Sequence, residues 1–598
     1  MNLAWILLFL PLAAAAVNQL VLRKNPLVPL VSTGSAIATL VISFLLLGKR
    51  GISAFDWASI GEFHLQIGIQ LDQLSTGMMI VVTGIGALVH VFSLAYMKDD
   101  EAKARYFTGL SLFMFSMTGI VLANNFIMTF IFWELVGLSS YLLIGHWYQK
   151  DSAADAAKKA FLCNRVGDFG FMIGILMLWG ITGTLAFSEM KVPTGISSVT
   201  LSAAILCIFC GAIGKSAQVP LHVWLPDAME GPTPVSALIH AATMVAAGVY
   251  MLFRVQVSIG ADAFDGFAGN VIAWTGGITA LVAALMAVQQ DDIKRVLAYS
   301  TLSQLGYMVM AVGLVHGEAG MFHLFTHAWF KALLFLGSGA VIYSCHHEQD
   351  IWKMGGLLKK MPITGLTFAI GTAALIAVPF VTSGFYSKEE ILAAAYGKQK
   401  ILFGVAVFVA FLTTFYMTRA FVVAFLGKTR SENADHAHEV GPLMLVPLVL
   451  LACMAIGSAW LTGSLNAMDP RAHAEGHHEG HALILGASIG SLVLGLLAGF
   501  VLYKGKDEDP LSIPLLKNRF YIDSIYDNFL VRYFQDAFAA IVHFFDELLI
   551  NGLLVGGLSR GAVSFGNLFR KIQSGELQGY AFAFGLGVIL VIYFTVFL

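Results

Sequence analysis

Apolar positions along this chain fall in long blocks, and short polar or charged segments separate the blocks. The blocks recur from Leu3 to Leu598, and most are close to the ~20 residues that a helix needs to cross a bilayer. The pattern therefore predicts an all-α polytopic membrane protein with about sixteen transmembrane helices. The expected spans are 3–22, 27–48, 73–97, 106–122, 124–147, 160–182, 201–228 (broken), 233–256, 268–288, 296–315, 319–343, 363–393 (broken), 401–425, 441–463, 482–503 and 579–598.

Two segments depart from the spanning pattern. Residues 60–71 alternate between polar and apolar positions, which predicts a short surface hairpin. Residues 517–571 spread charged side chains through an otherwise apolar sequence, which predicts an amphipathic helix lying along a surface. We expect the last span, 579–598, to anchor this lateral helix.

Two of the apolar spans are predicted to break within the membrane. In the first, Pro220 follows Lys215 by five residues. In the second, Pro379 and Gly384 precede Lys388. A proline-broken helix is tolerated in lipid only where its freed backbone is buried in protein or lines a wet cavity. The two broken spans lie five spans apart, and this odd offset predicts two inverted five-helix repeats.

These features divide the chain into six regions. In chain order they are N-terminal helices with the hairpin (1–105), a first antiporter-like repeat (106–256), a second antiporter-like repeat (268–425), additional transmembrane helices (441–503), the lateral amphipathic helix (517–571) and the anchoring helix (579–598).

Positive charges in the loops predict the orientation of the chain. If the N-terminus faces outward, nineteen Lys and Arg residues, Lys294 among them, are counted in inward loops. Seven, Arg254 among them, are counted in outward loops. This asymmetry favours an outward N-terminus.

Composition excludes several classes of function. Hydrophobic residues make up 58% of the chain and charged residues 12%, against roughly 25% charged in a soluble domain. The net charge of −2 gives no reason to expect nucleic acid. Cys207 and Cys210 form a C-x-x-C inside an apolar run, and no iron–sulfur framework or dinucleotide fingerprint is present in the sequence. We therefore expect no cofactor and no metal on this chain.

The candidate chemistry lies in ionisable residues placed at membrane depth. Such residues are costly in lipid and usually mark a transport path. Histidine exchanges protons near neutral pH, and desolvation brings lysine and glutamate toward the same range. A Glu–Lys pair ~6 Å apart at an effective dielectric of ~20 interacts by roughly 3 kcal/mol, enough to load and unload a proton. The candidates are Glu134, Arg165, Asp168, Lys215, His240, His323, His327, Lys331 and Lys388.

Seven of the nine candidates have a plainer alternative. Lys215 could extend to the membrane interface, Glu134 could be a structural ion-pair partner, and His240 could be a core histidine. Arg165 and Asp168, three residues apart, could form a structural pair. His323 and His327 have metal-ligand spacing without an evident third ligand. Two further groups are predicted to be solvated: the loop 291–295, and the histidines 436, 438, 473, 477, 478 and 481.

The motifs closely resemble the antiporter-like subunits of respiratory complex I (NADH-quinone oxidoreductase), above all the subunit L family. The resemblance covers most of the chain. The stretches that carry it are Phe132–Glu134, Asn164–Asp168, Gly214–Gln218, Gly231–Val245, Asp292–Thr301, His323–Lys331 and Gly384–Lys388.

This resemblance implies roles for the candidates. Glu134 and Lys215 would form a half-channel pair, and Asp168 and Arg165 would tune its surroundings. His240 and the row His323, His327 and Lys331 would form a connecting polar axis, with Lys388 on the exit side.

The resemblance also implies a setting. Quinone reduction in other subunits would drive proton pumping, and NADH, FMN, iron–sulfur clusters and quinone would belong to those subunits. The partners would be other membrane subunits of complex I, especially neighbouring antiporter-like subunits along the lateral helix, in a bacterial inner (cytoplasmic) membrane. The alternatives are the large subunit of a multisubunit sodium/proton antiporter, a related hydrogenase or bicarbonate-uptake subunit, and a structural scaffold.

Overall fold

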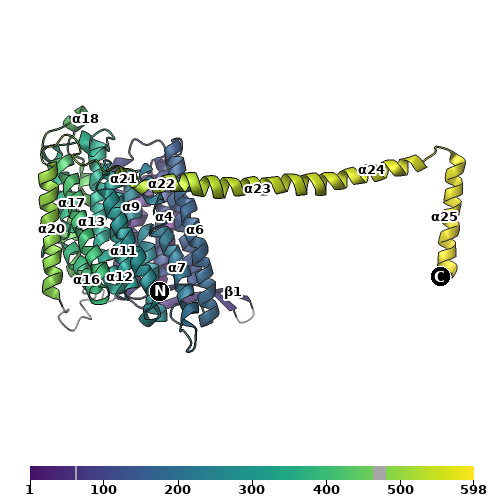
Figure 1. Cartoon of the computed structure of the whole chain (residues 1–598), viewed down its shortest axis with the longest axis horizontal. Coiled ribbons are helices and arrows are strands. Elements are labelled where there is room, and N and C mark those ends of the chain that lie inside the picture. The colour runs from purple at the N-terminus through teal and green to yellow at the C-terminus, as the bar shows by residue number, and fades with distance from the viewer. Residues whose placement is uncertain (24, 61–62, 462–479, 598) are drawn as a thin grey trace. The chain divides into compact units, whose positions relative to one another are not determined.

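The computed structural model describes the chain except residues 24, 61–62, 462–479 and 598. The described residues form two compact units, Met1–Phe520 and Tyr521–Leu598. The first unit is a bundle of long helices with a hairpin at one end (Figure 1). Its first half contains α1 (Asn2–Val17), η1 (Asn18–Leu22), α2 (Val28–Leu46), β1 (Gly51–Ile60), β2 (Phe63–Leu71), α3 (Gln73–Tyr96), α4 (Lys103–Leu122), α5 (Phe126–Ile144), α6 (Asp151–Thr182), α7 (Ser198–Lys215), α8 (Trp224–Asp227), η2 (Ala228–Glu230), α9 (Thr233–Ala241) and α10 (Met244–Ile259).

The second half of the bundle continues to the start of the second unit, which is called the tail below; residues 504–519 are its root. It contains η3 (Ala261–Phe264), α11 (Phe267–Ala287), α12 (Ile293–Gly313), α13 (Gly317–Ser344), η4 (Ile351–Lys353), α14 (Leu357–Lys360), α15 (Pro362–Leu375), α16 (Ser383–Lys398), α17 (Lys400–Phe425), α18 (Glu432–Asp435), α19 (Pro442–Leu461), α20 (His481–Tyr503), α21 (Pro514–Lys517) and η8 (Arg519–Tyr521).

The prediction of a polytopic helical membrane protein is confirmed. Among the described residues, sixteen helices are long and apolar enough to cross a membrane. Fifteen of them coincide with expected spans, and the sixteenth, Arg519–Ile572, is the segment we expected to be amphipathic. The expected span 363–393 is not in this set because its break leaves two shorter helices, α15 and α16.

Small residues let the helices of the bundle approach closely. A Cβ added to Gly306 of α12 would lie 2.6 Å from the backbone nitrogen of Ala280 in α11. A Cβ added to Gly276 of α11 would lie 2.5 Å from the backbone nitrogen of Met310. Close backbone contact through glycine is a common way to pack helices in lipid, where no hydrophobic force holds them together.

The hairpin is longer than the sequence pattern indicated. Strands β1 and β2 pair antiparallel from Gly51↔Leu71 to Ile60↔Phe63, with a bulge between Asp56 and Ala58. Among the described residues, the predicted segment 60–71 therefore covers the last residue of β1 and the whole of β2. Its partner strand was missed because residues 51–60 lack a clean alternation of polar and apolar positions.

Both predicted helix breaks are present, and a third was not predicted. Helix α7 ends at Lys215 and α15 ends at Leu375, and each is followed by a non-helical turn before the next helix. The expected continuous span 233–256 is divided into α9 and α10 by Ala242 and Thr243. The hydroxyl of Thr243 donates to the backbone oxygen of Leu238 at 2.5 Å, which satisfies one carbonyl that the break frees.

The root of the tail is fastened to the bundle by one buried arginine. Arg419 of α17 is fully buried. Its guanidinium donates to Asp291 and to Asp509, both at 2.7 Å, and to the backbone oxygen of Gln290 at 2.5 Å. The backbone nitrogen of Ile513 donates to Gln289 at 3.0 Å beside it. Residues 504–519 therefore pack as part of the first unit.

The second unit is a long helical run followed by a separate helix. It contains α22 (Ile522–Ile525), η9 (Tyr526–Asp536), α23 (Ala537–Phe545), η10 (Asp546–Val555), α24 (Gly556–Ile572) and α25 (Leu577–Phe597). The run from Ile522 to Ile572 is continuous through its glycines, and at ~1.5 Å per residue it is about 80 Å long. Its apolar side chains are exposed.

Candidate functional site

The first broken helix places Lys215 at the end of α7. The side chain of Lys215 is fully buried. The break leaves the last carbonyls of α7 without helical partners, and the indole of Trp224 donates to the backbone oxygen of Gly214 at 3.1 Å. Ser216 donates to the backbone oxygen of Val245 at 2.6 Å, which fixes the turn against α10. The alternative that Lys215 extends to the membrane interface is therefore wrong.

Four charged side chains form a chain from α5 through α6 to α7. Glu134 forms an ion pair with Arg165. Arg165 lies 3.9 Å from Asp168, measured from Nη1 to Oδ2, and Lys215 Nζ lies 3.5 Å from the same Oδ2. Their order is therefore Glu134, Arg165, Asp168, Lys215.

This order corrects the pairing that the resemblance implied. The direct partner of Lys215 is Asp168, and the direct partner of Glu134 is Arg165. Asp168 is held in place because the indole of Trp133 donates to its other oxygen at 2.7 Å. The sequence cannot reveal whether Glu134 or Asp168 pairs with Lys215. Arg165 and Asp168 lie on one helix face, and the carboxylates of Glu134 and Asp168 can each reach a cation on a neighbouring helix.

His240 lies on α9, directly before the unpredicted break. Its side chain is fully buried, and neither ring nitrogen has a hydrogen-bond partner among the described residues. One face of the imidazole stacks on Phe335 of α13, with ring centroids 5.3 Å apart. A buried polar group without a partner costs about 1–3 kcal/mol, so His240 differs from a satisfied core histidine.

The row His323, His327 and Lys331 lies on α13, and all three side chains are buried. The two imidazole centroids are 5.9 Å apart. Lys331 donates to Ser300 of α12 and, at 3.2 Å, to the backbone oxygen of Leu297. The predicted i, i+4, i+8 row is therefore one face of one helix, in contact with α12.

Hydrogen bonds connect this row to the second broken helix. One ring nitrogen of His323 bonds Gln304 of α12 at 3.0 Å, and the other bonds Ser387 of α16 at 2.9 Å. The next residue, Lys388, is buried and donates to the backbone oxygen of Leu375 at 2.9 Å. Leu375 is the last residue of α15, so Lys388 satisfies a carbonyl that the break frees.

The structure therefore brings the predicted candidates into two groups with His240 on the helix between them. The first group is the charge chain on α5, α6 and α7, and the second is the row on α13 with Lys388 on α16. Sequence reasoning missed the neutral partners Trp133, Ser300, Gln304 and Ser387, because neutral polar residues are common in membrane helices. In the part of the chain that the structure describes, no group of three His, Cys, Asp or Glu side chains could hold a metal ion.

The structure contradicts two predictions about charged residues that were expected in loops. The loop 291–295 is not a solvated loop, because Lys294 is only 3% exposed and lies within α12. Arg254, counted as an outward loop residue, is buried in α10 and paired with Asp72. Of the histidines expected to be solvated, 473, 477 and 478 lie outside the described residues.

Comparisons with known proteins agree with this fold and these motifs. Residues 123–413 match the family described as "NADH:quinone oxidoreductase/Mrp antiporter, TM". Residues 57–107 match "NADH-Ubiquinone oxidoreductase (complex I), chain 5 N-terminus".

Curated relatives match over nearly the whole chain. NADH-quinone oxidoreductase subunit L of Rickettsia bellii is 39% identical, over 100% of this chain and 98% of its own length. NAD(P)H-quinone oxidoreductase chain 5 of a Picosynechococcus species is 39% identical, over 99% of both chains.

Two solved structures have a similar fold. One is the Mrp complex from Dietzia sp., with a TM-score of 0.74 and 24% identity over 100% of this chain and 63% of that chain. The other is the archaeal membrane-bound sulfane sulfur reductase, with a TM-score of 0.68 and 22% identity over 83% of this chain and 99% of that chain.

Buried charges at the breaks of a polytopic helical bundle define an antiporter-like membrane subunit, and the resemblance found in the motifs is confirmed. The chain belongs to the family of NADH-quinone oxidoreductase subunit L and chain 5.

Proposed function

We propose that this chain is the proton-translocating, antiporter-like subunit of an NADH-quinone oxidoreductase. In this proposal Glu134, Arg165 and Asp168 control the relay, and six buried residues carry the protons: Lys215, His240, His323, His327, Lys331 and Lys388. The observation that supports this most is the placement of Lys215 and Lys388, each fully or almost fully buried at the break of a helix. The carbonyls freed by the break and the buried lysine together form a site that can bind a proton and release it.

In this proposal, the charge chain controls the proton on Lys215. Arg165 lies between two carboxylates and can favour Glu134 or Asp168. Charges 4 Å apart interact by about 4 kcal/mol at an effective dielectric of ~20. If Arg165 shifts toward Asp168, the Asp168 carboxylate attracts the ammonium of Lys215 less strongly. Lys215 then gives its proton to His240.

From His240 the proton would continue along α13 to the second broken helix. His327 lies beside the backbone of Ala241, next to His240 in the chain. Lys331, His327 and His323 lie on one face of α13. Ser387 forms a hydrogen bond with His323 and directly precedes Lys388 in the chain. Lys388 would then release the proton on the exit side.

The neighbouring subunit would meet the chain at Glu134 and Arg165. Their side chains are 23% and 36% exposed, although they lie on apolar helices. The exposed residues around them include Leu138 and Val166. A half-exposed ion pair on an apolar helix face is expected to contact another membrane subunit, which could shift Arg165 by its own charges.

The remaining setting follows from the family. NADH, FMN, iron–sulfur clusters and quinone would be bound by other subunits, and the segment from Ile522 to Ile572 would reach along neighbouring antiporter-like subunits as a lateral helix. The membrane would be the bacterial inner membrane, with the N-terminus outside. The two inverted repeats would be residues 106–256 and 268–425.

Substitution of the two lysines at the breaks tests the proposal. In the assembled complex reconstituted in vesicles, Lys215→Ala and Lys388→Ala should each keep quinone reduction and lose this subunit's share of proton transport. Lys400→Ala is the matched control, because that lysine begins α17 outside the polar groups described above. Full transport in an assembled double variant would refute the relay, and sodium-dependent transport without quinone reduction would favour the antiporter alternative.

A further inference from the structure

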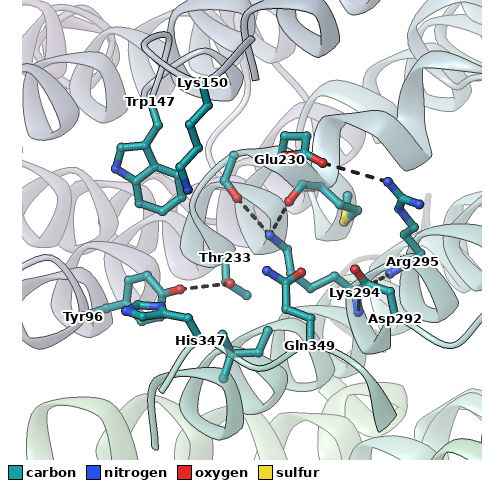
Figure 2. Close-up of a pocket in the computed structure, with 13 residues that line it drawn as sticks. Tyr96, Trp147, Lys150, Glu230, Thr233, Asp292, Lys294, Arg295, His347 and Gln349 are labelled. Carbon is teal, nitrogen blue, oxygen red and sulfur yellow. Dashed lines mark hydrogen bonds and ion pairs between the residues drawn. The ribbon is translucent and has the colours of Figure 1, made fainter. Parts of the chain in front are cut away.

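A cavity of about 350 Å³ opens where several helix ends meet on one face of the bundle. It is bounded by the end of α3, the turn before α6, the turn before α9, the start of α12 and the segment after α13. Figure 2 shows Lys150, Glu230, Thr233, Lys294 and Arg295 around it. This volume is sufficient for several water molecules, each of which occupies roughly 30 Å³ in the liquid.

Lys294 lies deepest among the cations of this cavity. Its side chain is 3% exposed, and its ammonium donates to the backbone oxygens of Met229 and, at 2.9 Å, of Gly231. Beside it, burial raises the pKa of the Asp292 carboxyl. The side chain of Asp292 accepts from the backbone nitrogens of Lys294 and Arg295, at 2.8 and 3.1 Å, and so begins α12 at the cavity.

A stripe of polar side chains leads inward from the cavity along α9. Thr233 begins the helix and lines the cavity, where its hydroxyl bonds Tyr96 at 3.2 Å (Figure 2). Ser236 and His240 follow at i+3 and i+7, so the three share one helix face. At ~1.5 Å per residue, His240 is about 10 Å from Thr233 along the axis.

The inner members of this stripe have no partner for their polar atoms. Ser236 is 1% exposed and His240 is fully buried. The Ser236 hydroxyl and both His240 ring nitrogens form no hydrogen bond with any described residue. Water is the usual hydrogen-bond partner of such buried groups. The unpaired hydroxyl of Ser236 and the two unpaired ring nitrogens of His240, on the face of α9 that starts at the cavity, therefore indicate a hydrated path.

We infer that the face of α9 formed by Thr233, Ser236 and His240 is the proton uptake path, leading from the cavity at Lys294 to the relay. This inference rests on the proposed function and adds where protons enter. A proton from water at the cavity would pass through water and hydroxyl groups, each accepting one proton and giving one on. It would reach a ring nitrogen of His240, and His240 would return a proton to Lys215 after that lysine has given up its own. Under the proposed orientation, the cavity opens on the inner face.

Thiol accessibility tests the path without relying on transport. In the assembled complex, Ser236→Cys should react at least tenfold faster than Val235→Cys with a small water-soluble methanethiosulfonate reagent. Val235 is the matched control because it is as buried as Ser236 and lies on the far side of α9 from Thr233 and His240. Equal, slow labelling of both cysteines would overturn the inference.

Blocking the path tests its use. Ser236→Leu should lower proton transport per electron to the level of Lys215→Ala, while Val235→Leu, on the far side of α9, retains wild-type transport. Full transport in assembled Ser236→Leu, with transport lost in Lys215→Ala, would overturn the uptake path and leave the relay intact. Full transport in both would instead refute the proposed function. If Ser236→Leu does not assemble, the labelling comparison decides.

Discussion

Gly137 shows how little room surrounds the buried lysine of the first broken helix. It lies on α5, one turn after Glu134. A Cβ added at Gly137 would come within 2.7 Å of Lys215 Nζ. That distance is shorter than real Cβ contacts, so the flexible end of the lysine would have to move from its present position beside Asp168.

Gly137→Ala should therefore reduce proton transport without loss of the fold. Alanine favours a helix by about 1 kcal/mol over glycine, so the stability of α5 should not fall. Displacing the ammonium of Lys215 should lower this subunit's share of transport roughly tenfold, measured as protons per electron in vesicles. The control is Gly180→Ala in α6, where an added Cβ has nothing within 4 Å. Equal transport in both variants would contradict the argument.

At this scale, the sequence could identify the charged residues but not their partners. Glu134, Lys215 and Lys388 stand out because a charge is costly within an apolar span. Lys294 was missed because two aspartates precede it, which is typical of a loop, although its helix begins one residue earlier. Hydrogen bonds such as that from Trp133 to Asp168 depend on how helices face one another, which the sequence does not contain.

Among the helices, the close approach of α15 and α16 depends on one glycine. A Cβ added at Gly384, near the start of α16, would lie 1.9 Å from the backbone oxygen of Ala374. Ala374 directly precedes the last residue of α15. Backbone atoms cannot move aside as a side-chain end can, so any larger residue must separate the two halves of the broken helix.

Gly384→Ala should consequently destabilise the second broken helix. Overpacking of this kind costs about 1–3 kcal/mol, and it should lower the thermal transition of the purified complex. It should also reduce transport, because Lys388 donates to the carbonyl of Leu375 across this junction. Gly404→Ala in α17 has open space around its Cβ and should leave both measurements unchanged. An unchanged transition temperature in Gly384→Ala would disprove this reasoning.

The helix breaks differ in how visible they are in the sequence. The breaks after α7 and α15 carry Pro220 and Pro379, and both were predicted from them. The break between α9 and α10 occurs at Ala242 and Thr243, where no proline or glycine stands. Tertiary contacts, among them the bond of Ser216 to Val245, fix that third break, so local sequence alone could not reveal it.

For the whole molecule, the two units predict separable roles. The first unit contains all nine candidate residues and packs compactly, whereas most apolar side chains of residues 521–597 are exposed. Exposed apolar surface on this scale needs partners, lipid or both.

Truncation after Phe520 should leave the first unit folded and abolish its assembly with other subunits. The helical content per residue and the thermal transition of the purified fragment should match those of the full chain in detergent, since the root is held by Arg419. Copurification of the other complex I subunits should be lost. Retention of those subunits by the fragment would contradict the role of the tail. Loss of assembly here, with transport unaffected by the lysine variants, would support the scaffold alternative.

The anchorage around Arg419 has a consequence for inherited or engineered variation. A substitution of Arg419 or Asp509 would leave all nine candidate residues in place and still loosen the segment that leads into the second unit. Such a variant would yield a complex whose parts fold individually but separate during purification. Its defect would be traced to a residue outside both candidate groups.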